Sequence, residues 1–217
     1  PGGPDVPELD DDRPITSVEG GKVNEGSPYG VFTVTGNDGQ KVKLELTDGA
    51  ATGGTDGSDK TGATDYIETF EYFDGTDWQT YTPGSYVEIP TGGELLVRVA
   101  IVNDELPEGD HEFTLTATNT GGKGETGTIT INDEGEGTTW VPVDPSIPGV
   151  PPSGLIPVDP TDPTAPAPGE PVVPGGPDVP ELDDDRPLTS VEGGTVNEGS
   201  PYGVLTVKGN YGQKVKL

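Results

Sequence analysis

Short runs of alternating apolar and polar residues cover the first two thirds of the chain. They are rich in β-branched and aromatic residues, and turn residues such as Asp74-Gly75 separate them. The main runs are Val31–Thr35, Val42–Leu46, Tyr66–Phe73, Trp78–Tyr81, Tyr86–Ile89, Leu95–Ile101, Glu112–Thr118 and Thr126–Ile131. No segment repeats its apolar residues at helical spacing. The pattern predicts an all-β chain with an antiparallel, immunoglobulin-like β-sandwich over residues 15–137.

A proline-rich segment follows the predicted sandwich, over residues 138–187. Its prolines recur at every third residue in three phases, which begin at Pro142, Pro157 and Pro168. A polyproline II helix has three residues per turn, so each phase aligns its prolines along one stripe. We expect an extended polyproline II linker that packs on its own or a neighbouring sandwich. The apolar residues available for this packing are Val141, Val143, Ile147, Val150, Leu155, Ile156 and Val158.

The end of the chain repeats its beginning. Residues 174–217 and residues 1–44 differ at five positions, Ile15/Leu188, Lys22/Thr195, Phe32/Leu205, Thr35/Lys208 and Asp38/Tyr211. The offset of 173 residues suits one domain plus a connector. We therefore predict that residues 1–14 end a preceding linker and that residues 188–217 begin the next repeat. On this interpretation the sequence is a window onto a longer tandem array.

Composition narrows the possible functions. Thirty-nine acidic residues against eleven basic ones give a net charge of −28, which disfavours binding to nucleic acid or to anionic membranes. No apolar run approaches the roughly 20 residues of a membrane span, so we expect no membrane insertion. The chain has no cysteine, and its one histidine, His111, stands between two acids and is expected to be solvated. Without nucleophile–base pairs we expect that the protein is not an enzyme.

Acidic and amide residues gather where the predicted strands end. They stand at 24–25, at Asp65, along 103–110 and at 132–134. Several strand ends can meet at one end of an antiparallel sandwich, and carboxylates that converge repel each other unless a cation lies between them. Calcium takes six to eight oxygen ligands and is the natural candidate. Solvation explains any single acidic loop residue equally well, but four such groups favour a cation site.

Four motifs occur in order along this region: VNEG at 23–26, Asp65-Tyr66, VNDELPEGDHEFTLTAT at 102–118 and GTITINDEGEG at 127–137. From Val23 to Glu136 the chain resembles a Calx-β-type domain. It also resembles the immunoglobulin-like repeats of giant bacterial surface adhesins of the RTX type, which type I systems secrete. The resemblance implies Ca²⁺ at one end of the sandwich and an extracellular location on a bacterial cell surface.

The resemblance also implies a set of calcium ligands. They are Glu25, Asp65, Asn103, Asp104, the carbonyl of Leu106, Glu108, Asn132, Asp133 and Glu134. Asn103 and Asn132 stand where calcium-sensing members usually have aspartate, and Gly109 and His111 stand where those members often have acids. Fewer charges indicate fewer ions or weaker binding, which fits a structural site more than a sensor.

Two functions follow as expectations. The first is a structural repeat, stiffened by calcium, that extends or polymerises to mediate cell adhesion or to build a biofilm matrix. Its partner is then the chain itself, as tandem repeats or as a fibre in which the linker or a strand docks on a neighbouring subunit. The alternative is a glycan-binding adhesive module that uses Tyr72, Trp78, Tyr81 and Tyr86, although core packing explains these aromatic residues better.

Overall fold

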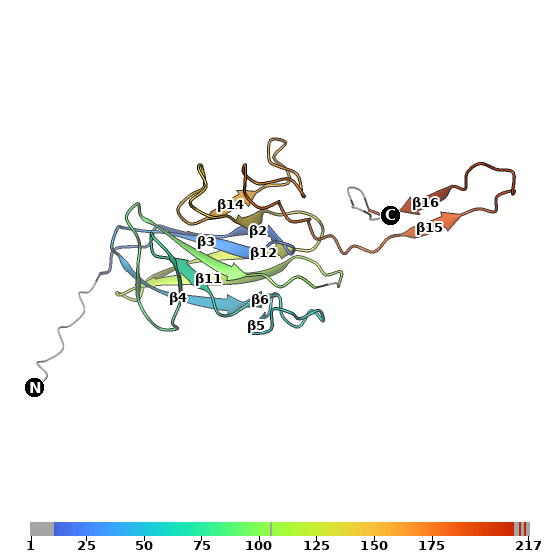
Figure 1. Ribbon diagram of the computed structural model, residues 1–217. Coiled ribbons are helices and arrows are strands. Elements are labelled where there is room, and N and C mark those ends of the chain that lie inside the picture. Colours follow the sequence, from blue (N-terminus) through green and yellow to red (C-terminus); the bar gives the residue numbers. More distant parts are fainter. Residues whose placement is uncertain (1–10, 105, 211–212, 214, 216–217) are drawn as a thin grey trace, which may run out of the picture.

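The computed structural model describes residues 11–104, 106–210, 213 and 215, and these residues form an all-β protein (Figure 1). Two five-stranded sheets make up its main body. The first sheet has the order β1 (Ser17–Glu19), β3 (Tyr29–Thr35), β10 (Glu94–Ala100), β7 (Glu71–Phe73) and β8 (Trp78–Thr80). The second has the order β2 (Gly21–Asn24), β12 (Gly124–Asn132), β11 (His111–Asn119), β4 (Lys41–Asp48) and β9 (Val87–Glu88). Nowhere in the described residues does a helix long and apolar enough to span a membrane occur.

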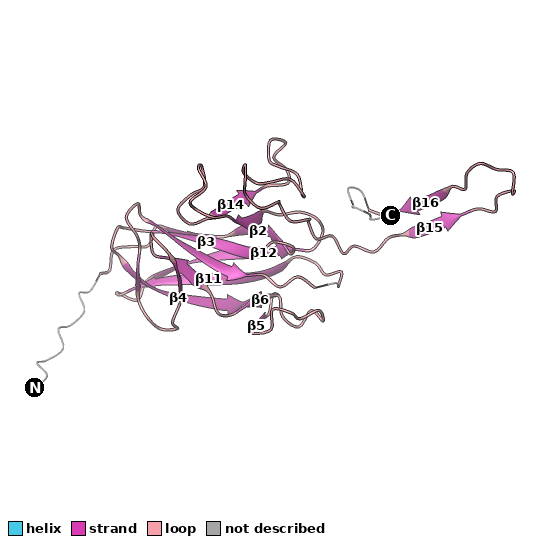
Figure 2. Ribbon diagram, viewed as in Figure 1, coloured by secondary structure: helices cyan, strands magenta, loops and turns pink. Residues whose placement is uncertain are grey.

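The two sheets pack face to face and form a β-sandwich (Figure 2). Alternate residues of β10 and β11 are buried, as the period of a half-buried strand requires, while the threonines of β11 face outward. Between the layers, the ring of Phe32 meets the ring of Phe113 edge to face, with centroids 5.6 Å apart. The prediction of an all-β sandwich is therefore confirmed.

Strand pairing in the second sheet brings several strand ends together. β2 runs parallel to β12, with Asn24 opposite Asn132. β11 runs antiparallel to β12, with His111 opposite Ile131. The last residues of β2 and β12 and the first residue of β11 therefore lie at one end of the sandwich. We call it the acidic end, because five acids lie there: Glu25, Asp65, Asp104, Glu108 and Asp133. The other end of the sandwich contains the turn after β11, at Thr120 and Gly121, and we call it the opposite end.

A short parallel pair, β5 (Gly53–Gly54) and β6 (Tyr66–Ile67), covers one side near the acidic end. The ring of Tyr66 stacks on Phe113 at 4.1 Å, and its hydroxyl donates to the Asp48 carboxylate at 2.5 Å. This packing fixes the backbone of Asp65, the preceding residue, next to the core.

The proline-rich segment does not form the continuous extended linker that its proline spacing predicted. Instead β13 (Thr139–Pro142) and β14 (Leu155–Val158) pair as an antiparallel hairpin. Asp144, Asp159 and Asp162 each accept the backbone N–H two residues onward and close a turn. Aspartate followed by proline is a strong turn signal, since proline presets the backbone at the second turn position. Regular proline spacing is compatible with either conformation, and burial of the apolar residues between the prolines favours the folded one.

This folded segment rests on its own sandwich (Figure 1). The Trp140 side chain packs against the main core, and its backbone N–H donates to Ser27 Oγ at 2.9 Å. The indole N–H of Trp78 donates to the Ser153 carbonyl at 2.7 Å. A second apolar cluster forms within the segment around Val141, Val143, Val158 and Val179. The segment thus packs on its own sandwich through Trp140 and Ser153, whereas the apolar residues expected to make this contact, such as Val141 and Val143, pack within the segment.

The start of the second copy forms a separate hairpin of β15 (Ser190–Gly193) and β16 (Leu205–Lys208). Val191 pairs with Val207, as Val18 pairs with Val34 in the first copy, so the register repeats at the same offset of 173 residues. The surroundings differ, because Leu205 is 72% exposed whereas its counterpart Phe32 is fully buried. The second copy therefore has the strand pairing of the first without its core.

Truncation at the centre of the sandwich tests this packing. Phe113→Ala removes both the edge contact with Phe32 and the stacked contact with Tyr66, and leaves a cavity. We expect the free energy of unfolding, measured by urea titration, to fall by about 3–5 kcal/mol. Thr114→Ala, one residue on and facing outward, is the matched control and should cost at most about 0.5 kcal/mol. Equal losses for the two variants would contradict the packing described.

Candidate metal centre

The acidic end is built from the ends of β2 and β12 and the loop between β10 and β11. Glu25 follows β2 and Asp133 follows β12, and Asp104 lies in that loop; all three are largely buried. Glu25 accepts a hydrogen bond from the Asp104 backbone N–H at 3.0 Å, and Asp133 accepts one from the Glu108 backbone N–H. The fold therefore holds carboxylates from three distant segments in fixed positions.

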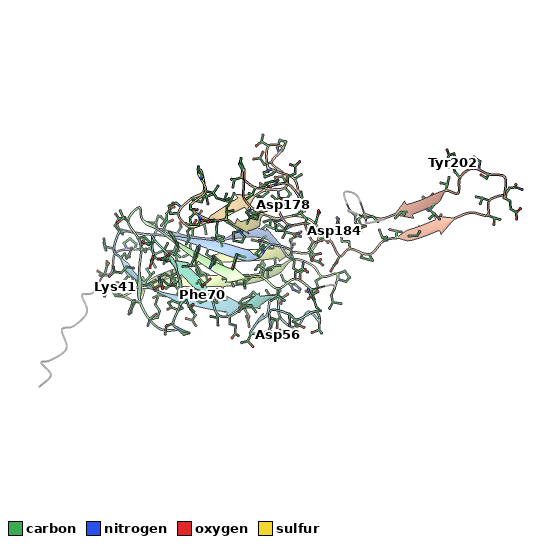
Figure 3. All side chains as sticks on the ribbon, in the orientation of Figure 1. Lys41, Asp56, Phe70, Asp178, Asp184 and Tyr202 are labelled. Atoms are coloured by element: carbon green, nitrogen blue, oxygen red, sulfur yellow. The ribbon has the colours of Figure 1, made fainter. Side chains whose placement is uncertain are left out.

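One cluster at this end consists of Glu25, Asp133 and Asp183, with one carboxylate oxygen from each within 4.8 Å of the others. Asp183 comes from the segment that leads to the β15–β16 hairpin, where Figure 3 labels the adjacent Asp184. The side-chain amide of Asn103 donates to Asp183 at 2.5 Å and orients it. The cluster thus joins the sandwich to the segment that leaves it.

Burial makes the charged forms of these acids unfavourable. Burial, together with repulsion from the nearby Asp104, Asp183 and Asp133, raises the pKa of Glu25 to about 8. Burial also raises the pKa of Asp183 to about 6, with added repulsion from Asp185 and Asp133. The pKa of Asp133 is raised as well, chiefly by burial. The three acids therefore resist being charged at the same time. A cation bound between them would stabilise their charged forms.

A second cluster contains Asp65, Glu108 and His111. His111 Nδ1 lies 2.8 Å from an Asp65 oxygen and 3.2 Å from a Glu108 oxygen. The hydrogen bond with Asp65 is the largest of the effects that raise the pKa of His111. The two acids on either side of the ring therefore favour the protonated form of His111. The expectation that His111 is a solvated residue is wrong, because its half-buried ring is hydrogen-bonded to Asp65 and lies against Glu108.

The two clusters differ in the cation that they suit. Glu25, Asp133 and Asp183 offer only carboxylate oxygens, which are the donors that a hard cation such as calcium or magnesium takes. The second cluster includes an imidazole nitrogen, a donor that suits transition metals better than calcium or magnesium. The first cluster therefore has the donor set that fits a hard cation.

The structure divides the proposed ligand residues into two groups. Glu25 and Asp133 lie in the first cluster, Asp65 and Glu108 lie in the second, and Asp104 contacts Glu25 through its backbone. The Asp104 carboxylate itself accepts the backbone N–H of Leu106 at 2.7 Å. These five acids converge on one end of the sandwich, as expected from their places at strand ends.

The other proposed ligands have different contacts. Asn103 and Asn132 use their amide N–H groups to orient acids, Asp183 and Asp110 respectively. The side chain of Glu134 is exposed, and its backbone N–H donates to Asn132 Oδ1. The Leu106 side chain is also exposed. Asp183 and His111 are cluster members that the sequence motifs did not indicate. Asp183 stands in an acidic run assigned to the linker, and only the repeat at an offset of 173 residues shows that this run adjoins a domain end.

The aromatic residues of the β7–β8 hairpin have partners within the protein. The guanidinium of Arg98 lies 4.3 Å from the centre of the Trp78 ring, and the indole N–H of Trp78 is bonded to Ser153. Tyr81 stacks on Phe70 at 4.8 Å and is buried, while Lys43 lies over the half-exposed Tyr86. Trp78 and Tyr81 are thus engaged within the protein, whereas Tyr86 is partly exposed, and the glycan-binding alternative stays a prediction.

No protein-family model matches the chain. No curated protein matches it either. Among solved structures, the chain is similar to a lipoprotein from Bacteroides thetaiotaomicron, determined in solution by NMR, at 13% identity and a TM-score of 0.32. The match covers 60% of this chain and 88% of that protein.

The raised pKa values predict how stability depends on pH when no divalent cation is present. Between pH 4.5 and about 8 the folded protein holds a proton on Glu25 that the unfolded chain has lost, so the free energy of unfolding should decrease as pH rises through this range. Urea titrations at pH 5.5 and pH 8 in chelator measure the decrease. Glu25→Gln should reduce it, whereas Glu45→Gln, on the exposed face of β4, should not. A stability that increases with pH, or equal slopes for both variants, would contradict this prediction.

Proposed function

We propose that the chain is a structural repeat of an extracellular bacterial surface adhesin or fibre, an immunoglobulin-like sandwich of the Calx-β type that calcium stiffens. The observation that supports this best is the cluster of Glu25, Asp133 and Asp183. Its acids come from the end of β2, the end of β12 and the segment that leads to the second copy. A cation bound by all three would tie that segment to the sandwich.

Electrostatics explains why such a cation would act as a stiffening element. Without it, the three acids either repel one another or must be protonated, as their raised pKa values indicate. A divalent cation replaces this repulsion with attraction on all three segments at once. Without the cation, Asp183 would be held by its hydrogen bonds to Asn24 and Asn103.

The proposed task is to provide reach and rigidity between other parts of a long surface protein. The second copy of the sequence, with the strand register of the first, supports repetition along one chain. The segment of residues 138–187 folds onto its own sandwich, so the length of an array would come from the number of repeats. In a fibre of separate subunits, the exposed apolar residues of β15 and β16 would be covered by a neighbouring sandwich. The partner in either arrangement is the same chain.

Calcium binding is tested by thermal and urea unfolding with calcium and with chelator. Calcium at a hundred times its dissociation constant should add about 2.7 kcal/mol to the free energy of unfolding, since it binds the folded state alone. Glu25→Gln and Asp133→Asn should each lose most of this gain.

Glu45→Gln is the matched control, because it removes one exposed acid far from the cluster and should keep the full calcium response. Magnesium in place of calcium tests the choice of ion, since magnesium requires a tighter octahedral set of ligands. Absence of any calcium response at pH 8, or an equal response in all variants, would refute the proposed site.

A further inference from the structure

The segment of residues 181–187, which we call the connector, occurs twice in the sequence. Residues 8–14 have the same sequence, ELDDDRP, and the structure describes that first copy from Asp11 onward. The two copies lie at the two ends of the sandwich (Figure 1). The structure therefore shows one sequence in two different environments.

The copy at 181–187 is bonded to the acidic end. The buried side chain of Asn24 donates to the Asp183 carbonyl at 3.1 Å and accepts from the Asp183 N–H at 2.8 Å. The Asp185 N–H donates to the Asp133 carbonyl at 3.3 Å. Gly26 permits the close approach, because a Cβ there would lie 2.9 Å from the Glu181 carbonyl oxygen and 3.2 Å from the Asp183 nitrogen.

The copy that begins the chain is bonded to the opposite end. The Thr120 hydroxyl accepts from the Asp11 N–H at 2.6 Å and donates to the Asp11 carbonyl at 3.1 Å. The side-chain amides of Asn119 and Gln40 both donate to the Arg13 carbonyl. Gly121 permits this approach, because a Cβ there would lie 2.7 Å from the Cβ of Asp12.

The two sets of bonds use different atoms of the connector. At the acidic end they involve the backbone of Asp183 and Asp185. At the opposite end they involve Asp11 and Arg13, whose counterparts in the second copy are Asp184 and Arg186. In an extended strand the backbone groups of successive residues point to opposite edges, so one connector can be bonded along both edges at once.

The second copy of the connector already makes some of the contacts that the first copy makes at the opposite end. Gln213 donates to the Arg186 carbonyl, as Gln40 does to Arg13. The Arg186 guanidinium pairs with Asp184 at 2.7 Å, as that of Arg13 pairs with Asp11. These contacts form while Asp183 and Asp185 remain bonded to the acidic end. The contacts of Arg186 with Gln213 and Asp184 are thus compatible with the bonds to the acidic end within one connector.

We propose that the connector is a two-sided joint that binds the acidic end of one sandwich along one edge and the opposite end of a second copy of this sandwich along the other. Asp183 and Arg186 are three residues apart, so the two ends would approach to roughly 10 Å. Successive sandwiches would then be held in one orientation. The proposal rests on the proposed function only in taking the second sandwich as the next repeat, and it does not require calcium.

Amide hydrogen exchange on the full chain in chelator tests each edge separately. Gly26→Ala should speed exchange of the Asp183 amide and leave that of Asp11 unchanged. Thr120→Val, which removes one hydroxyl and keeps the shape, should do the reverse. Each loss of protection should be about fivefold or more, the factor that corresponds to one hydrogen bond. Unprotected amides at Asp183 or Asp11 in the unmodified chain would overturn the joint.

Orientation is tested by adding a second copy of residues 45–173 after Leu217, which completes a second sandwich. The chain has no cysteine, so Glu45→Cys and the same change in the second sandwich give two unique spin-label sites. Pulsed electron resonance in chelator should give one narrow distance peak. Gly26→Ala in the first sandwich together with Thr120→Val in the second should abolish it.

The calcium response separates this joint from the proposed function. Suppose that the distance peak is narrow in chelator and that calcium does not change the free energy of unfolding. This result would support the joint and refute the calcium site. A peak that is narrow only with calcium would overturn the joint, because the ion alone would then set the orientation. A broad distribution under both conditions would overturn it too.

Discussion

The parallel pairing of β2 with β12, and the buried Asn24 amide at its end, organise the acidic end of the molecule. The Asn24 amide nitrogen lies within 3.3 Å of three carbonyl oxygens, those of Asn132, Glu136 and Asp183. These oxygens belong to the last strand of the sandwich, the loop after it and the connector. An amide has two hydrogens to offer, so the three acceptors share them and any displacement leaves a buried carbonyl without a donor. The positions of Glu25, Asp133 and Asp183 all depend on this arrangement.

Much of the sandwich could be predicted from the sequence, because its strands and turns are encoded by short stretches of neighbouring residues. Alternation in β10, β11 and β12 shows which residues face the core, and glycine or aspartate turns show where strands end. Acids placed at strand ends could likewise be expected to converge. Their partners could not, since the pairing of His111 with Asp65 and the division into two clusters depend on loop conformations that no short motif encodes. Asn103 and Asn132 illustrate the same limit, because an amide can serve as ligand or as donor, and only its neighbours decide.

The proline-rich segment shows how one periodicity can lead to the wrong structure. Its prolines do recur at every third residue, but the Asp-Pro turns and the apolar residues between them carry the stronger signal. Val141 and Val158 are buried in one apolar cluster within the segment. Trp140 packs against the core of the sandwich. Hydrophobic burial rather than backbone preference therefore determines where this segment lies. Pro142 and Pro157 are tolerated because β13 and β14 form a two-stranded sheet, in which each strand has one edge that needs no donor.

The exposed β15–β16 hairpin implies an order of events during folding. Its strands pair without the rest of a sandwich around them, so this pairing needs only nearby sequence. The β2–β12 pairing, in contrast, joins Asn24 to Asn132 across 108 residues. Closing such a long loop has a high entropic cost, and pairing is therefore slow. In the proposed array of repeats, each unit would therefore form its local strand pair first and close only after its last strand has been synthesised. The acidic end would be the last part of each unit to assemble, and the connector that follows it would bind only to a completed sandwich.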